Sequence, residues 1–131
     1  MNTEVMRNTL KASETGKQTF PEVIRALMGA GVESYHADFA RGEDTFYMPN
    51  GKTHVEKMEI PDTKIAEDFS PEALVATIRA VQADQIRYPD FLPRAMAAGT
   101  TGYWVYLTGK RVIYFGRKGE THVEEFPRSK P

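Results

Sequence analysis

The stretch Gly119-Glu120-Thr121-His122-Val123-Glu124 repeats an earlier one, Gly51-Lys52-Thr53-His54-Val55-Glu56, at a separation of 68 residues. Sliding residues 1–59 onto residues 69–127 without a gap gives thirteen identical positions. Near-matches fall at structurally informative places, since Asn2 and Ser70 are both good helix N-caps. An ungapped match of this kind indicates an ancient tandem duplication.

Each copy is expected to run helix, helix, strand, strand, strand. Apolar residues recur at helical spacing over residues 2–14 and 19–31, and again over residues 70–84 and 88–99. Strands are expected at 33–39, 45–48 and 52–59 in the first copy and at 102–108, 111–116 and 120–126 in the second. Glycine-containing turns separate most of the strands, which favours antiparallel meanders.

The predicted fold is therefore α+β, a duplicated helix-helix-three-strand unit with pseudo-twofold symmetry and antiparallel meander sheets packed against helices. One unit of about 60 residues has little core of its own. We expect a single domain over 1–131, with repeats at 1–60 and 69–127 and a linker at 61–68. The pattern leaves open whether the two meanders join in one sheet or stack as two.

Composition narrows the class of protein. The 131 residues contain no cysteine, which excludes disulfides and thiolate chemistry, and the net charge is −1. This charge favours neither nucleic acid nor membrane as a partner, and no apolar run approaches the roughly 20 residues of a membrane span. The N-terminal residues carry an early acid and no apolar segment, so we expect no secretory signal and a cytoplasmic protein.

The residues Tyr103-Trp104-Val105, Val112-Ile113-Tyr114 and His122-Val123-Glu124, with Tyr88-Pro89-Asp90-Phe91 upstream, carry a resemblance to a known family. The chain resembles a bacterial family of unknown function, small soluble proteins often labelled "phage envelope protein", some of them encoded in cryptic prophages. The resemblance implies a cytoplasmic α+β protein. It brings no activity, cofactor or catalytic residue with it.

The paired His-x-Glu motifs are candidate catalytic residues: His54, Glu56, His122 and Glu124. On a strand, residues i and i+2 share a face about 6.5–7 Å apart, so each motif can point its histidine and its glutamate the same way. Pseudo-symmetry could bring both motifs together as an acid–base site or as a divalent-metal site with His54 and His122 as ligands. The simpler reading is a hairpin strand kept for folding, and we predict neither a metal nor a cofactor.

Aromatic side chains on the expected strands are candidates for a ligand pocket or a partner surface: Tyr35, Tyr47, Trp104, Tyr106 and Tyr114. Trp104 and Tyr106 share one face of their strand, opposite Tyr103 and Val105. A face that no helix covers would become a partner surface. The alternative is that these side chains are ordinary core and cross-strand pairs.

Charge differs between the copies. Seven basic and nine acidic residues up to residue 59 give −2, whereas nine basic and six acidic residues from residue 69 onward give +3. Acids that include Glu43 and Asp44 are expected at a solvated turn of the first copy, in the zone where the second copy carries Lys110 and Arg111. A sharper interpretation is complementary contact between halves or between subunits.

These patterns favour a non-enzymatic binding or interaction protein, which we expect to self-associate as a homodimer, and the resemblance implies a prophage origin. One alternative is a small metal-dependent or acid–base enzyme that uses the paired His-x-Glu motifs. Another is a small-ligand-binding protein with an aromatic pocket.

Overall fold

The computed structural model describes residues 1–126 of the chain, so the expected end of the second repeat at residue 127 lies outside the described residues. The order of elements is helix, helix and three strands, twice over. The elements are α1 (Thr3–Glu14), α2 (Phe20–Gly29), β1 (Ser34–Asp38), β2 (Glu43–Tyr47), β3 (Thr53–Lys57), α3 (Pro71–Gln82), α4 (Tyr88–Ala97), β4 (Thr100–Tyr106), β5 (Arg111–Gly116) and β6 (Thr121–Glu125). The predicted α+β class is confirmed.

The backbone carries the duplication more clearly than the side chains do. The bounds of α1 and α3, of α2 and α4, and of β3 and β6 differ by 68 residues at both ends. Within residues 1–126, the residues with positive φ also form four pairs at this separation: Gly16 with Asp84, Gly31 with Gly99, Gly42 with Lys110, and Gly51 with Gly119. The same left-handed turns therefore persist in both copies, even at the two places where another residue has replaced glycine.

Helix starts follow the capping signals in the sequence. Before α2, the Thr19 hydroxyl accepts a hydrogen bond from the Glu22 backbone N–H, and the Glu22 carboxylate accepts one from the Thr19 N–H. This reciprocal pair is a capping box, which satisfies two N–H groups that the helix itself leaves unpaired. Before α4, Asp90 accepts from the Arg87 N–H at 3.5 Å, so half of the arrangement is kept.

The two meanders join edge to edge, which resolves the question left open by the sequence. The strand order is β3-β2-β1-β4-β5-β6, and all neighbours are antiparallel. β1 and β4 pair at the centre, where Tyr35 lies opposite Val105 and His36 lies opposite Trp104. The pseudo-twofold axis therefore passes between these two strands.

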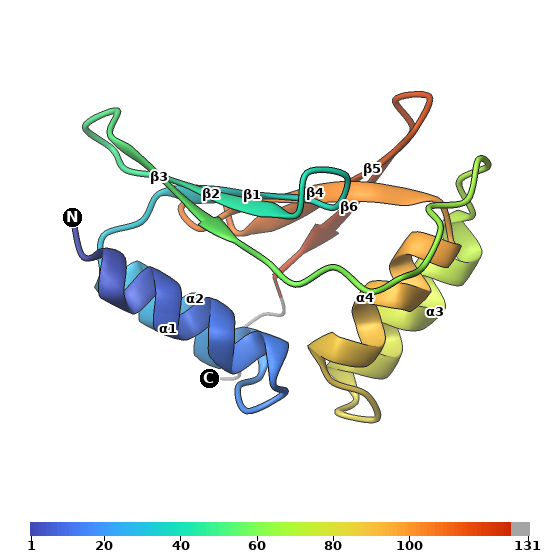
Figure 1. Ribbon diagram of the computed structural model, residues 1–131, viewed down its shortest axis with the longest axis horizontal. Coiled ribbons are helices and arrows are strands. Elements are labelled where there is room, and N and C mark those ends of the chain that lie inside the picture. The colour runs from blue at the N-terminus through green and yellow to red at the C-terminus, as the bar shows by residue number, and fades with distance from the viewer. Residues whose placement is uncertain (127–131) are drawn as a thin grey trace.

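The helices lie on one face of the sheet (Figure 1), with α1 and α2 under one half and α3 and α4 under the other. Within residues 1–126, no helix covers the opposite face (Figure 1). Because strand side chains alternate, β2 turns Asp44 and Phe46 toward the helices and Thr45 toward the uncovered face. Within residues 1–126, no helix is both long and apolar enough to cross a membrane.

Candidate ligand-binding site

A cavity of about 360 Å³ lies between the sheet and the two helix pairs. Its wall is mainly apolar and aromatic, and includes Tyr35, Phe46, Tyr88, Phe91, Tyr103 and Tyr114. Two pairs among these are equivalent in the duplication, Tyr35 with Tyr103 and Phe46 with Tyr114. The cavity therefore crosses the pseudo-twofold axis and needs both repeats to form.

The tyrosines place hydroxyl groups inside this apolar wall. The Tyr88 and Tyr103 hydroxyls are hydrogen-bonded at 3.1 Å, and the ring of Tyr35 meets that of Tyr103 edge-on at 6.4 Å. Burial raises the pKa of Tyr35, Tyr88 and Tyr103 above the ordinary value for a phenol. These hydroxyls are therefore neutral and serve as hydrogen-bonding groups.

Asp44 is the unusual member of the wall. It extends from β2 into the helix-covered face and is 4% exposed. Its Oδ1 atom has no hydrogen-bond partner within the described residues. Burial, with a smaller contribution from the negative charge of Glu14, raises the Asp44 pKa to about 8. A buried, unpaired carboxyl with a perturbed pKa in a cavity marks a candidate functional residue.

Asp44 corrects an expectation from the sequence. The sequence predicts a solvated charge at a turn, but β2 starts at Glu43, and the strand alternation then turns Asp44 inward. Its equivalent in the second repeat is Val112, which also lines the cavity. An acid in one repeat at an apolar position of the other was the signal that could have identified it.

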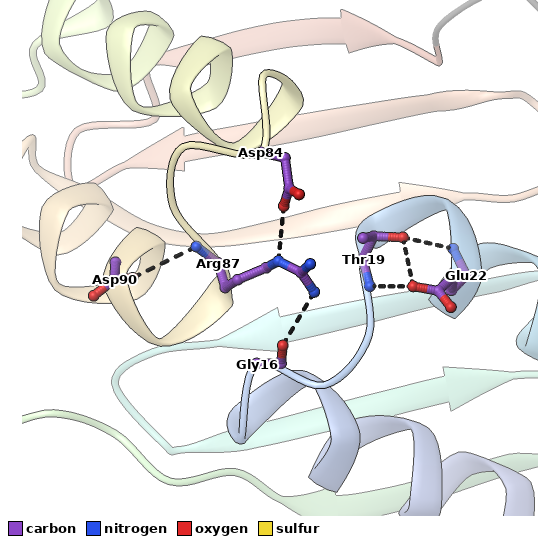
Figure 2. Close-up of polar contacts among 6 residues, drawn as sticks. All are labelled: Gly16, Thr19, Glu22, Asp84, Arg87 and Asp90. Carbon is purple, nitrogen blue, oxygen red and sulfur yellow. Dashed lines mark hydrogen bonds and ion pairs between the residues drawn. The ribbon is translucent and has the colours of Figure 1, made fainter.

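At the rim of the cavity, Arg87 connects the turns of the two helix pairs, and Figure 2 shows its polar contacts. The Arg87 guanidinium lies between Asp84, which it meets at 2.7 Å, and the Gly16 carbonyl oxygen, to which it donates at 3.1 Å. Gly16 belongs to the turn after α1, and Arg87 to the equivalent turn after α3. Arg87 therefore fastens the two repeats together beside the α2 capping box.

A second unpartnered acceptor lies at this rim. The side-chain oxygen of Gln18 is buried, lines the cavity and has no hydrogen-bond partner among the described residues. No pattern in the sequence marks Gln18, Arg87 or the hydroxyl pair of Tyr88 and Tyr103 as site residues. Arg87 acts through a contact between the repeats, and Tyr88 and Tyr103 meet only when α4 packs on β4, so spacing along the chain does not reveal either contact.

The two His-x-Glu motifs do not meet. β3 and β6 are the opposite edges of the sheet, and five strand spacings put them about 24 Å apart. This separation excludes a metal or acid–base site shared by the two motifs within one chain, and it corrects the hypothesis that pseudo-symmetry brings them together. Among residues 1–126, no group of three or more histidine, aspartate or glutamate side chains has the arrangement of a metal site.

Each motif instead contacts the helix beneath its own edge strand. His54 is hydrogen-bonded to Glu56, which Arg7 of α1 meets at 3.5 Å. At the other edge, Glu124 contacts both His122, at 3.1 Å, and Arg79 of α3, at 2.9 Å.

Burial alone would raise the Glu124 pKa, but the hydrogen bonds from His122 and Arg79 outweigh it and the pKa is lowered. Glu124 is therefore ionised and already paired, and both motifs serve to fasten sheet edges to helices.

The five aromatic candidates separate into two groups. Tyr35 and Tyr114 line the cavity, whereas Tyr47, Trp104 and Tyr106 lie on the uncovered face of the sheet. There the ring of Trp104 stacks on that of Tyr106, with centroids 5.8 Å apart, and contacts that of Tyr47 at 5.1 Å. The structure thus contains an enclosed aromatic wall and an open aromatic surface.

Comparison with known proteins places the chain in a family. A family model described as "Protein of unknown function (DUF1398)" matches residues 8–125. The chain belongs to this family. The match does not bear on the phage-envelope label, which stays a prediction from the resemblance.

The chain is also similar to uncharacterized proteins of Mycobacterium tuberculosis and Mycobacterium bovis. Each is 35% identical to it over 63 residues, which is 48% of this chain. The match spans only 38% of the length of each mycobacterial protein. These relatives carry no described activity in their names, so the functional argument rests on the geometry of the site.

Proposed function

We propose that this protein is a non-enzymatic binding protein that holds a small, largely apolar molecule in the cavity between its repeats. The observation that carries the proposal is the unpaired Asp44 carboxyl in an otherwise apolar wall of about 360 Å³. Small-molecule sites in proteins are typically concave, of a few hundred Å³, and lined by apolar and aromatic groups with a few polar groups that fix orientation.

The second repeat supports a role for Asp44 beyond folding. A valine at the equivalent position fits the same fold, so the strand itself does not need a carboxyl there. A buried carboxyl without a partner destabilises the folded state, by about 1–3 kcal/mol for a neutral polar group and by more for a charge. A ligand that supplies the missing partner would offset this penalty.

A thermal-shift screen of small molecules tests the proposal. Ligands of the cavity are expected to stabilise the wild type by about 2.7 kcal/mol when present at about 100 times their dissociation constant. Val81→Trp places a large ring into the cavity from α3 and is expected to abolish these shifts. Met28→Trp, on the exposed surface of α2, should leave them unchanged.

Two outcomes would contradict the proposal. A screen of common metabolites without a single stabilising compound is one. The other is a set of compounds that stabilise the Val81→Trp variant as much as the wild type, because such compounds bind elsewhere. Circular dichroism of the unliganded variants provides the check that each one folds.

The open face supports a second proposal, namely self-association of two copies. Val55 and Val123, which are equivalent in the duplication, are each 47% exposed and lie on the edge strands β3 and β6 of the sheet that carries Tyr47, Trp104 and Tyr106. Cross-strand neighbours of opposite charge lie at both edges, Glu43 with Lys57 and Arg111 with Glu125. A second copy could therefore meet this face without an excess of like charge.

Light scattering tests this second proposal. The wild type is expected to have the mass of a dimer, and the double variant Val55→Lys with Val123→Lys that of a monomer, because two buried charges would oppose association. Met28→Lys, on an exposed helix surface, should keep the dimer. A monomeric wild type would contradict self-association and leave the cavity proposal intact. Cytoplasmic location and prophage origin stay predictions from the sequence.

A further inference from the structure

Some polar groups in the wall of the cavity have hydrogen-bond partners and others do not. The two buried polar atoms in its wall that lack partners, Oδ1 of Asp44 and the side-chain oxygen of Gln18, are both hydrogen-bond acceptors. When Asp44 is ionised, a ligand that satisfies both atoms must donate hydrogen bonds or carry positive charge. A carboxylate or phosphate ligand would leave both without partners and would meet the Asp44 carboxyl directly.

The charges of the wall point the same way. The ionisable acids lining the cavity are Asp44, Asp84, Glu124 and Glu125, of which Asp84 is paired with Arg87 and Glu124 with Arg79. Arg87 is already engaged, by Asp84 and by the Gly16 carbonyl. Among the described residues of the wall, no lysine or second arginine is available to neutralise Asp44.

The aromatic wall suits a cation as well. The rings of Tyr35, Tyr103 and Tyr114 follow one another along the sheet, with centroid separations of 6.4 Å and 5.6 Å. The face of an aromatic ring carries negative potential and attracts an ammonium group within about 6 Å of its centre. The attraction of a cation to the Asp44 carboxylate and its weaker attraction to the rings are both stronger in a cavity that excludes water.

We propose that the cavity takes an apolar organic cation, whose ammonium group pairs with Asp44 while its apolar part lies against the aromatic wall. This inference rests on the proposed binding function and specifies its ligand class. The structure defines the chemistry of the ammonium group and of the apolar body, and the same features fit a substituted amine or a quaternary ammonium compound.

The protonation state of Asp44 gives ligand binding a measurable dependence on pH. The groups around it are Glu14 from α1, Glu56 opposite it on β3, and the tyrosines of β1, α4 and β4. Where α2 and the middle of α3 line the cavity, the side chains are apolar. They include Val23 of α2 and Ile78 of α3. With a pKa of about 8, the carboxyl is mostly protonated at neutral pH in the empty cavity.

A permanent cation binds the ionised carboxylate, so binding releases a proton below pH 8. Its affinity is then expected to rise about 50-fold between pH 6 and pH 8, because the ionised fraction rises from about one in a hundred to one half. A neutral ligand that accepts a hydrogen bond from protonated Asp44 would show the opposite trend. The direction of the pH profile therefore distinguishes the two ligand classes.

The experiment compares benzyltrimethylammonium with neopentylbenzene, which has the same shape but a carbon atom in place of the charged nitrogen. Calorimetry with the full chain is expected to show tighter binding of the cation at pH 8, by at least about tenfold. Asp44→Asn should remove that preference and the pH dependence together. Asp62→Asn, at an exposed acid that does not line the cavity, is the control and should keep both.

The outcomes separate this inference from the proposed function. If neutral compounds from the screen occupy the cavity while the cation binds no better than its neutral counterpart, the ligand class is wrong and the binding function stands. Tight cation binding that Asp44→Asn does not weaken would also overturn the inference. If no compound of either kind depends on the cavity in the Val81→Trp test, the proposed function itself fails.

Discussion

Replacing Asp44 with asparagine is expected to make the protein more stable than the wild type at pH 8, with the difference disappearing near pH 4. Asparagine has the shape of a protonated aspartate and no charge to bury. The Asp44 pKa is about 8 in the folded protein, against an ordinary value of 3.8. Each unit of difference corresponds to about 1.4 kcal/mol, so the variant should gain roughly 5 kcal/mol at pH 8 as an order of magnitude.

The sign follows from proton counting. Between pH 4 and pH 8 the folded protein holds a proton on Asp44 that the unfolded chain has released, so the stability of the wild type falls as pH rises. Below the ordinary pKa both states are protonated, and the penalty is absent. Urea unfolding of both proteins across this range measures the difference, and parallel stability curves would contradict the buried position of Asp44.

Replacing Gly102 with alanine is expected to destabilise the protein by about 3 kcal/mol, because the added methyl group has no space. A Cβ atom at Gly102 would lie 2.3 Å from the Ala37 backbone oxygen. The two residues belong to β4 and β1, the strands through which the repeats join. The clash therefore forces apart the centre of the sheet rather than a flexible side chain.

Gly29→Ala is the matched control for this prediction. Gly29 is the last residue of α2, and an added Cβ would meet nothing within 4 Å. Alanine loses less conformational freedom than glycine on entering a helix, so this variant is expected to gain up to about 1 kcal/mol. In denaturant unfolding, the midpoint of Gly102→Ala should fall below that of the wild type, and the midpoint of Gly29→Ala should rise above it. Equal stability of Gly102→Ala and wild type would show that β1 and β4 do not approach as closely as described.

The duplication made most of the fold predictable from the sequence. Caps such as Thr19 and turn residues such as Gly51 act through local geometry, and local geometry can be read along the chain. Because both copies show the same pattern, each supports the order of helices and strands predicted for the other. The joining of the meanders was not predictable, because it depends on pairing between β1 and β4, which are separated by more than 60 residues.

The site was harder to predict for the same physical reason. His54 and His122 stood out as repeated motifs, yet they lie at opposite sheet edges and fasten strands to helices. Asp44 did not stand out, because a charged residue next to a turn is ordinarily solvated. Its burial results from a strand that begins two residues earlier than expected and from two helix pairs that enclose the same space.

The pKa of Asp44 itself is the most direct test of this ligand site. Carbon-13 NMR of the Asp44 carboxyl group measures it with and without benzyltrimethylammonium. We expect a pKa of about 8 in the empty protein and a fall when the cation binds, because the ammonium group stabilises the carboxylate. A pKa in the ordinary carboxyl range near 4 that the cation leaves unchanged would contradict this expectation.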